Sequence, residues 1–227
     1  MSLKLVFISD THNAIHNMDI PDGDVLIHSG DATMWGTEEE IDTFIHQFLD
    51  LPHKHKIFVP GNHDFGFEDD QAQSIKFGME AHYLVNSGIE IDGYKFYGSP
   101  AQGDLSGWAW YCKNKQKLKA HWDKIPDDTD VLITHVPPHL ILDELAQSAM
   151  ERHGNTDNPN IGCPYLRAAV LTRVKPTIHA FGHIHEGYGA KKIEDTTFIN
   201  SAVMDENYHR RNKPIIAYLN KGKNKKV

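Results

Sequence analysis

Ile178-His179-Ala180-Phe181-Gly182-His183-Ile184-His185 is an apolar run that ends in a glycine and two histidines. The run predicts a buried β-strand, and each histidine after it can point a ring nitrogen at a metal ion. By itself the pattern is weak, because paired histidines after a strand are often polar caps. Its meaning depends on the residues at the ends of the other strands.

Four earlier apolar runs end in the same way. Each is short and is followed by side chains that can bind a metal. These runs are Leu5–Ser9 before Asp10 and His12, Val25–Ser29 before Gly30 and Asp31, Ile57–Pro60 before Gly61, Asn62, His63 and Asp64, and Val131–Thr134 before His135. Separate structural explanations would have to recur at all five strand ends, so the sequence favours one shared metal site.

Short, wholly apolar runs are typical of strands buried on both faces of an α/β sheet. Strands are expected at 3–8, 24–29, 55–59, 130–134, 177–181, 196–200 and 214–219, with a hairpin at 89–98. Helices are expected after a Thr37/Glu40 capping box, at 69–82, at 113–124, from Leu140 to a stop at Gly154, and from Pro164 to Val174. One domain is expected over 1–220, followed by a basic, disordered tail at 221–227.

Composition limits the function classes. The net charge of −8 argues against coating long nucleic acids, although bound cations would still allow a small phosphorylated substrate. Two cysteines, Cys112 and Cys163, are too few for a disulfide framework, and neither a signal peptide nor a membrane span is evident. A cytoplasmic protein without a membrane partner is expected, and nothing in the sequence indicates its oligomeric state.

In a parallel sheet the carboxyl ends of the strands meet at one edge, where ligands bind. The candidate metal ligands there are two carboxylates, one amide and four imidazoles: Asp10, Asp31, Asn62, His12, His135, His183 and His185. They are too many for one zinc ion but suit two divalent ions that share a carboxylate. Two dications against two carboxylates leave about +2, which attracts phosphate. Mn²⁺ is expected first, and Fe, Zn, Ni or Co also fit such ligands.

The ordered set Asp10-x-His12, Gly30-Asp31, Gly61-Asn62-His63-Asp64, His135 and Gly182-His183-x-His185 resembles the signature of the calcineurin-like metallophosphoesterases. Tyr97–Pro100, Asp130–His135, Gly162–Pro164 and Gly182–Gly189 resemble, more narrowly, the metallophosphoesterase-domain (MPPED) branch. This resemblance implies a four-layer α/β/β/α sandwich of two mixed β-sheets flanked by helices. It also implies a metal-dependent phosphodiesterase acting on nucleotides, cyclic ones among them.

The resemblance also assigns roles. Asp10, His12, Asp31 and His185 would hold one metal, and Asp31 would share the second with Asn62, His135 and His183. His63 would be the general acid or a donor to the phosphoryl oxygens, with Asp64 orienting its ring. A hydroxide bridging the metals would attack phosphorus in line. The substrate would contact Asn62, His63, Gly162 and Cys163.

Several features of the sequence allow more than one interpretation. Val136 stands where the family often has glycine, which questions the local loop geometry. Cys163 at a helix start could have a lowered thiol pKa, although a capping or packed residue is the simpler interpretation. Trp108 is expected to pack over the domain, with a role facing the substrate as the alternative. The alternative functions are a phosphomonoesterase on phosphoproteins or small metabolites, and a non-catalytic module that binds a nucleotide or a partner protein.

Overall fold

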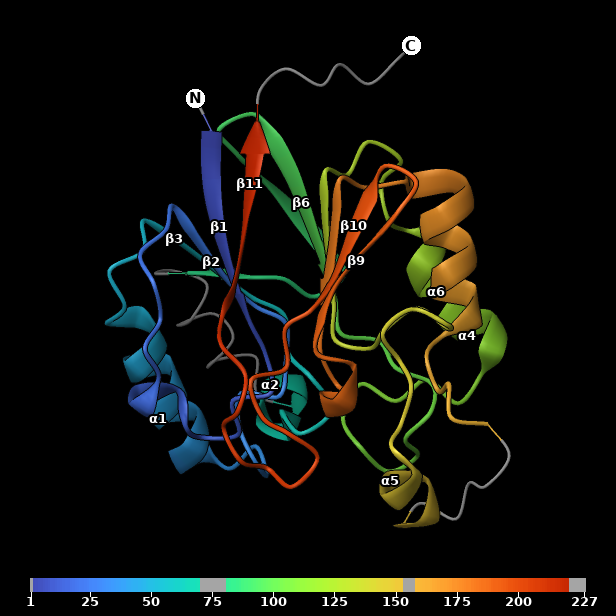
Figure 1. The fold of residues 1–227 in the computed structure, drawn as a ribbon, viewed down its shortest axis with the longest axis horizontal. Coiled ribbons are helices and arrows are strands. Elements are labelled where there is room, and N and C mark those ends of the chain that lie inside the picture. Colours follow the sequence, from blue (N-terminus) through green and yellow to red (C-terminus); the bar gives the residue numbers. More distant parts are fainter. Residues whose placement is uncertain (1, 70–80, 153–157, 221–227) are drawn as a thin grey trace.

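The computed structural model describes residues 2–69, 81–152 and 158–220. Two β-sheets lie face to face at the centre of the protein, with helices on their outer faces (Figure 1). The strand order is β11-β1-β2-β3-β4 in one sheet and β5-β6-β7-β8-β10-β9 in the other. Each sheet contains both parallel and antiparallel pairs, so the expected sandwich of two mixed sheets is confirmed.

The strands predicted from apolar runs are all present. The first sheet contains β1 (Ser2–Ile8), β2 (Val25–His28), β3 (His55–Phe58), β4 (His82–Tyr83) and β11 (Ile215–Asn220). The second contains β5 (Ser87–Ile91), β6 (Tyr94–Ser99), β7 (Val131–Thr134), β8 (Ile178–Phe181), β9 (Gly189–Ile193) and β10 (Thr196–Asn200). The sequence did not predict β4 or β9, because β4 has two residues and β9 carries a lysine pair.

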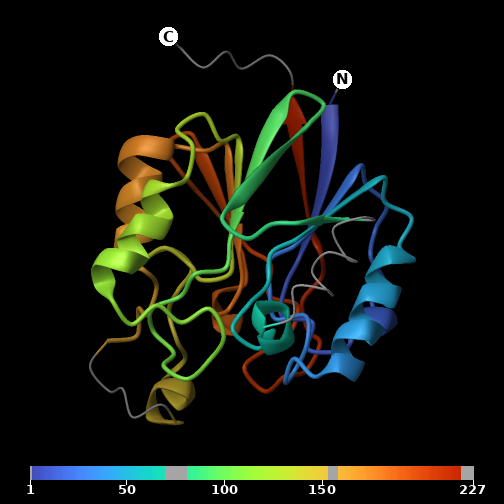
Figure 2. The ribbon, with the colours of Figure 1, turned by 180° about the vertical axis from the view of Figure 1, so that it is seen from behind.

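The helices cover opposite sides of the sandwich (Figure 2). They are α1 (Glu38–Leu49), α2 (Phe65–Asp69), α4 (Lys115–Asp123), α5 (Gln147–Arg152) and α6 (Pro164–Ala169), which continues into a π-helical turn, η2 (Val170–Val174). Two 3₁₀ turns, η1 (Ile15–Asn17) and η3 (His185–Gly187), complete the set within the described ranges. None of these helices is long and apolar enough to cross a membrane.

Three of the helix predictions need comment. The capping box is confirmed, since Thr37 and Glu40 each accept the other's backbone N–H. The helix expected from Leu140 is wrong over its first half: α5 starts only at Gln147, because Leu140 and Leu142 have φ values of 64° and 53°. The helix expected at 69–82 falls mainly on 70–80, and its neighbours Ala81 and His82 are not helical. Gly154 and the tail at 221–227 also lie outside the described residues.

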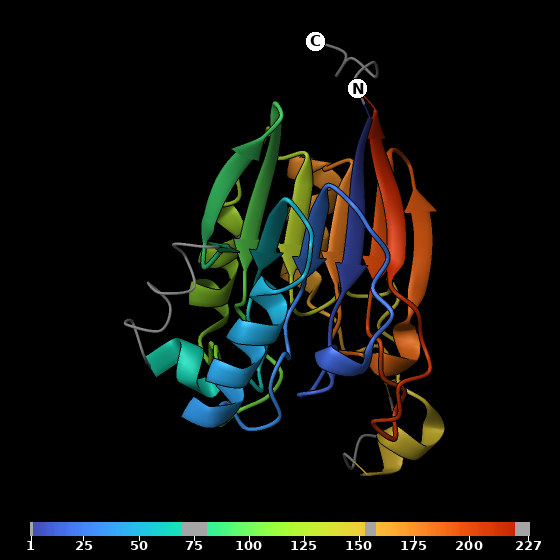
Figure 3. The same cartoon turned by 90° about the vertical axis from the view of Figure 1, so that its left-hand side faces the viewer.

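Strand alternation explains the layers. Leu5 and Phe7 of β1 point into the core between the sheets, whereas Val6 and Ile8 point into the core beneath α1. A third core fills the space between the second sheet and helices α4 and α6. The central strands β2, β7 and β8 are therefore buried on both faces, and the candidate ligands appear where these strands end. The carboxyl ends of the parallel strands of the first sheet meet at one edge, marked by the arrowheads in Figure 3.

Candidate metal centre

The loops after β1, β2, β3, β7 and β8 bring the seven predicted ligand residues together. Asp31 lies between two sets of them. Its Oδ2 is 4.0 Å from His12 Nε2, and its Oδ1 is 3.3 Å from His135 Nε2. Asn62 Oδ1 lies 2.9 Å from the same His135 nitrogen.

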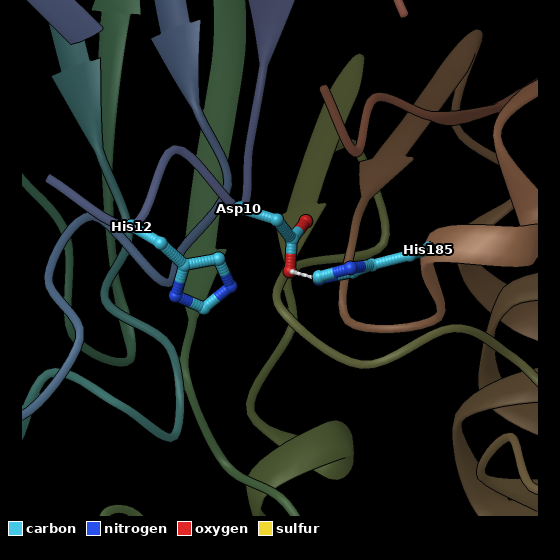
Figure 4. Close-up of side chains that lie close together, drawn as sticks. All are labelled: Asp10, His12 and His185. Atoms are coloured by element: carbon cyan, nitrogen blue, oxygen red, sulfur yellow. Dashed lines mark ion pairs between the residues drawn. The ribbon is translucent and has the colours of Figure 1, made fainter. Parts of the chain in front are cut away.

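Three groups of side chains could each hold an ion, and one of them, His12, Asp31 and His63, overlaps the other two. Asp10, His12 and His185 form the first group, in which His185 Nε2 points at the Asp10 carboxylate from 3.5 Å (Figure 4). Asp31, His135 and His183 form the second. Within each group the ligand atoms lie within 4.8 Å of one another. Asp31 belongs to two of these groups, so it is placed to be shared, and the assignment of the seven residues as metal ligands stays a prediction.

The backbone of the centre is strained, and glycines make room for it. Asp10, His12, Asp31 and His183 have φ values of 53°, 40°, 55° and 69°, in the left-handed region that costs roughly 1–2 kcal/mol per residue. A Cβ at Gly61 would lie 2.2 Å from Asp31 Oδ1. The glycines of the motifs are therefore required by close approach of the chain to the ligand side chains.

Three of the imidazoles are held at Nδ1 so that Nε2 faces the centre. Each Nδ1 lies at hydrogen-bonding distance from a backbone carbonyl: His12 from Thr33 O (3.1 Å), His135 from Ser29 O (2.9 Å) and His185 from Asp205 O (2.8 Å). His12 Nε2 is buried and has no hydrogen-bond partner. A buried nitrogen that lacks a partner and is aimed at carboxylates fits a divalent ion, and carbonyl-fixed imidazoles are usual for metal ligands.

His183 is fixed differently. Its Nε2 lies 2.9 Å from Asp104 Oδ2, and its ring packs at 5.0 Å from that of His135. Asp104 belongs to the loop between β6 and α4, which sequence reasoning treated as packing over the domain. No spacing or motif in the sequence links Asp104 to His183.

The carboxylates of the centre raise the pKa of two of its imidazoles. Burial alone would lower the pKa of His135, but the charge and hydrogen bond of Asp31 outweigh it and raise that pKa to about 10. The pKa of His185 is likewise raised to about 9, since its hydrogen bond to Asp10 and the charge of that carboxylate outweigh burial. For His12, burial prevails and lowers the pKa to about 4. Metal binding must therefore displace protons from two of the ligands.

Asp64 does not orient the ring of His63, contrary to expectation. Its carboxylate accepts hydrogen bonds from Gly61 N (2.7 Å) and from the backbone and hydroxyl of Thr33. His63 Nδ1 instead lies 2.6 Å from Met34 O. Burial, followed by the charge of Asp31, raises the pKa of Asp64 to about 6. Asp64 therefore shapes the loop, and the Met34 carbonyl sets the ring.

Cys163 caps a helix. Its sulfur accepts from Leu166 N at the start of α6, and burial raises the pKa of its thiol, so the interpretation of a lowered thiol pKa is wrong. The backbone N–H of Gly162 donates to the buried carboxylate of Asp143. Neither Gly162 nor Cys163 lines the cavity over the metal centre, whereas their neighbour Ile161 does. Substrate contact through Gly162 and Cys163 stays a prediction.

Val136 is accommodated without strain. Its side chain is 3% exposed and packs in the third core, beside α6. It is not among the residues with positive φ. A Cβ at this position is therefore compatible with the loop that presents His135.

A cavity of about 540 Å³ opens over the centre. Asp31, Asn62, His63, His183 and His185 form its floor. Its walls are apolar and aromatic, with three acidic side chains: Leu105, Trp108, Leu145, Ala149, Ile161, Ile184 and Tyr208, with Asp104, Glu186 and Glu206. Neither Lys nor Arg lines it in the part of the chain that the structure describes.

Comparison with known proteins agrees with this geometry. The family model for calcineurin-like phosphoesterases matches residues 3–187. A UPF0046 protein of Caenorhabditis elegans is 38% identical over 233 residues, covering 96% of this chain and 76% of its own. Human metallophosphoesterase domain-containing protein 1 is 35% identical over 239 residues, covering 95% and 71%.

A solved archaeal phosphodiesterase is 16% identical, with a TM-score of 0.45, over 95% of this chain and all of its own. The family match covers all five loops that build the metal centre, and the two relatives align with nearly the whole chain. The chain therefore belongs to the calcineurin-like phosphoesterase family.

Proposed function

We propose that this phosphoesterase is a phosphodiesterase that uses two divalent metal ions to hydrolyse a nucleotide diester. Mn²⁺ is the metal that we expect, ahead of Fe, Zn, Ni or Co. The observation that carries the choice of a diester is the charge of the cavity wall. Asp104, Glu186 and Glu206 line it, and no described Lys or Arg does. Two free cysteines fit the reducing cytoplasm in which we place the protein.

The wall charge favours a substrate with one negative charge at phosphorus. A phosphodiester carries one, whereas a monoester carries about −1.5 to −2 at pH 7. Sites that bind the second charge usually do so with Arg or Lys, which this wall lacks. Carboxylates at the same wall repel that additional charge. The apolar remainder of the wall suits the second organic group of a diester, and a volume of about 540 Å³ is in the range of sites for molecules of nucleotide size.

The side chains divide the work of hydrolysis. When bound, the two ions supply Lewis-acid polarisation of the phosphoryl group and acidify water. Asp10, Asp31, Asn62 and the four histidines would hold them, and the proximity of Asp10 to His12 and His185, and of Asp31 to His135 and His183, supports this assignment. Asp31, placed between the two groups, would belong to the ligand sets of both ions.

His63 is the proton donor in this proposal. Its Nδ1 carries a hydrogen, because the Met34 carbonyl beside it can only accept. Its Nε2 faces the centre, 3.9 Å from Asp31 Oδ2. Only the imidazolium form can donate from Nε2, so donation to a phosphoryl oxygen or to the leaving oxygen requires His63 to be protonated.

Hydrolysis of a bis-aryl phosphodiester and of an aryl phosphomonoester by the Mn²⁺-loaded protein tests the proposal. His63→Ala and Asp31→Asn should each depress diester turnover strongly, whereas His46→Ala, on the exposed face of α1, should not. Turnover of the monoester alone would establish the phosphomonoesterase alternative. No turnover of either ester by a protein with two bound ions would favour the binding module.

A further inference from the structure

Trp35 is an indole exposed to solvent beside the centre. Its side chain is 63% exposed, and it precedes α1. Its ring lies nearly parallel to that of Trp108, with centroids 6.4 Å apart and an interplanar angle of 17°. Trp108 in turn lies 4.4 Å from the ring of His63 and lines the cavity. A row of aromatic rings thus leads from the proposed proton donor to the surface.

The loop that carries Trp108 is held rigidly by one buried side chain. Gln102 is 0% exposed, and its amide oxygen accepts from the backbone N–H groups of Asp104 (3.2 Å) and Leu105 (2.9 Å). Its amide nitrogen donates to Leu105 O (2.9 Å) and Ala109 O (3.1 Å). Ala109 N then donates to the Asn62 carbonyl, which ties this loop to the metal-binding loop after β3.

Trp35 is also anchored through its backbone. Its N–H donates to Glu40 Oε2 (2.8 Å), the carboxylate that also closes the capping box of α1. The backbone that carries each indole is therefore anchored by hydrogen bonds, while the exposed Trp35 ring contributes little to the core. Trp108 lines the cavity and Trp35 stacks beside it, and aromatic groups that are ordered before the ligand arrives favour binding, because less conformational freedom is then lost.

We propose that Trp35 and Trp108 form a stacking subsite for a planar aromatic group of the substrate, a nucleobase. This inference rests on the proposed diesterase function and adds where the nucleoside binds. Flat faces in a nearly parallel pair suit a base better than an aliphatic chain, and stacking on aromatic side chains tolerates every base. The nucleoside lies on the His63 side of the cavity. Tyr208, which also lines the cavity, packs against the rings of His12 and His185.

Two diesters with the same leaving group isolate the contribution of the base. The p-nitrophenyl ester of TMP and methyl p-nitrophenyl phosphate carry the same charge, and only the first has a nucleobase. Trp35→Leu and Trp108→Leu should lower kcat/KM for the TMP ester about tenfold relative to the methyl ester, since stacking contributes ~1–3 kcal/mol per base. Trp35→Phe should restore most of the loss. Tyr218→Ala, which removes a 58% exposed aromatic from β11, is the matched control and should change neither substrate.

A binding measurement without turnover keeps the two proposals separate. Calorimetry should show that Trp35→Leu weakens AMP binding about tenfold and leaves ribose phosphate binding unchanged. If both tryptophan variants affect the two diesters equally, or AMP and ribose phosphate equally, the rings only support His63 and the subsite is refuted. If the wild type hydrolyses no diester, the proposed function fails, and the AMP comparison alone decides whether the indoles bind a base.

Discussion

Replacing Asp104 by alanine removes the carboxylate whose Oδ2 lies 2.9 Å from His183 Nε2. A carboxylate there fixes a hydrogen on Nε2 and leaves the Nδ1 lone pair of His183 free for a metal. A hydrogen bond involving a charged group contributes about 1.5–3 kcal/mol when buried. Because the Asp104 side chain is 26% exposed, we expect the low end, about 1.5 kcal/mol, which is roughly a tenfold loss of affinity.

The loss should fall on one ion only. Asp104 contacts His183, which belongs to the second group together with Asp31 and His135. Among the described contacts, its side chain touches no ligand of the first group. Calorimetric titration of the metal-free protein with Mn²⁺ should show one weakened and one unchanged binding step. Asp104→Asn keeps an oxygen acceptor and should lie between alanine and wild type. Asp128→Ala, which removes an exposed partner of Lys95, should bind both ions normally. Two unchanged steps, or two equally weakened steps, would refute this positioning role.

Three further predictions concern the centre and its supports. In chelator, the raised pKa values of His135 and His185 mean that their ion pairs stabilise the fold fully below about pH 6.5, and that this stabilisation is lost as the pH rises through about 9 for His185 and about 10 for His135. Thermal unfolding in chelator should therefore show a Tm that falls from about pH 6.5 to about pH 10, and a Tm that rises would contradict the assignment. Gly61→Ala places a Cβ 2.2 Å from Asp31 Oδ1 and should abolish binding of both ions, so elemental analysis should find neither metal in this variant. Gly93→Ala, in an open turn, should retain both ions. Asp143→Ala leaves the N–H groups of Leu140 and Gly162 without their acceptor and should lower the free energy of unfolding in urea by about 3 kcal/mol; a loss below about 1 kcal/mol would show that water replaces it.

The sequence allowed the ligand set to be predicted because strand ends and ligands coincide. Each candidate ligand comes after a short apolar run, and the carboxyl ends of parallel strands share an edge, so residues as distant as Asp10 and His183 were expected to meet. Here His183 N lies 3.0 Å from Asp10 Oδ1. Periodicity and a general topological rule were enough for this part of the site.

The rest of the site depends on contacts that have no periodicity. Asp104 and Trp108 reach the centre because the amide of Gln102 folds their loop, and no local pattern reveals that network. Asp64 adjoins His63 in the sequence, which suggested that Asp64 orients the His63 ring. Instead, the turn after Gly61 directs the Asp64 carboxylate back to the backbone N–H of Gly61. The orienting carbonyl of Met34 is a backbone atom, so no side-chain motif could identify it.

Anomalous diffraction from crystals of the Mn²⁺-loaded protein tests the central claim most directly. We predict two manganese peaks, one among Asp10, His12 and His185 and one among Asp31, His135 and His183, with the Asp31 carboxylate in contact with both. A single peak, or two peaks that do not share Asp31, would contradict the dinuclear centre on which the proposed hydrolysis depends.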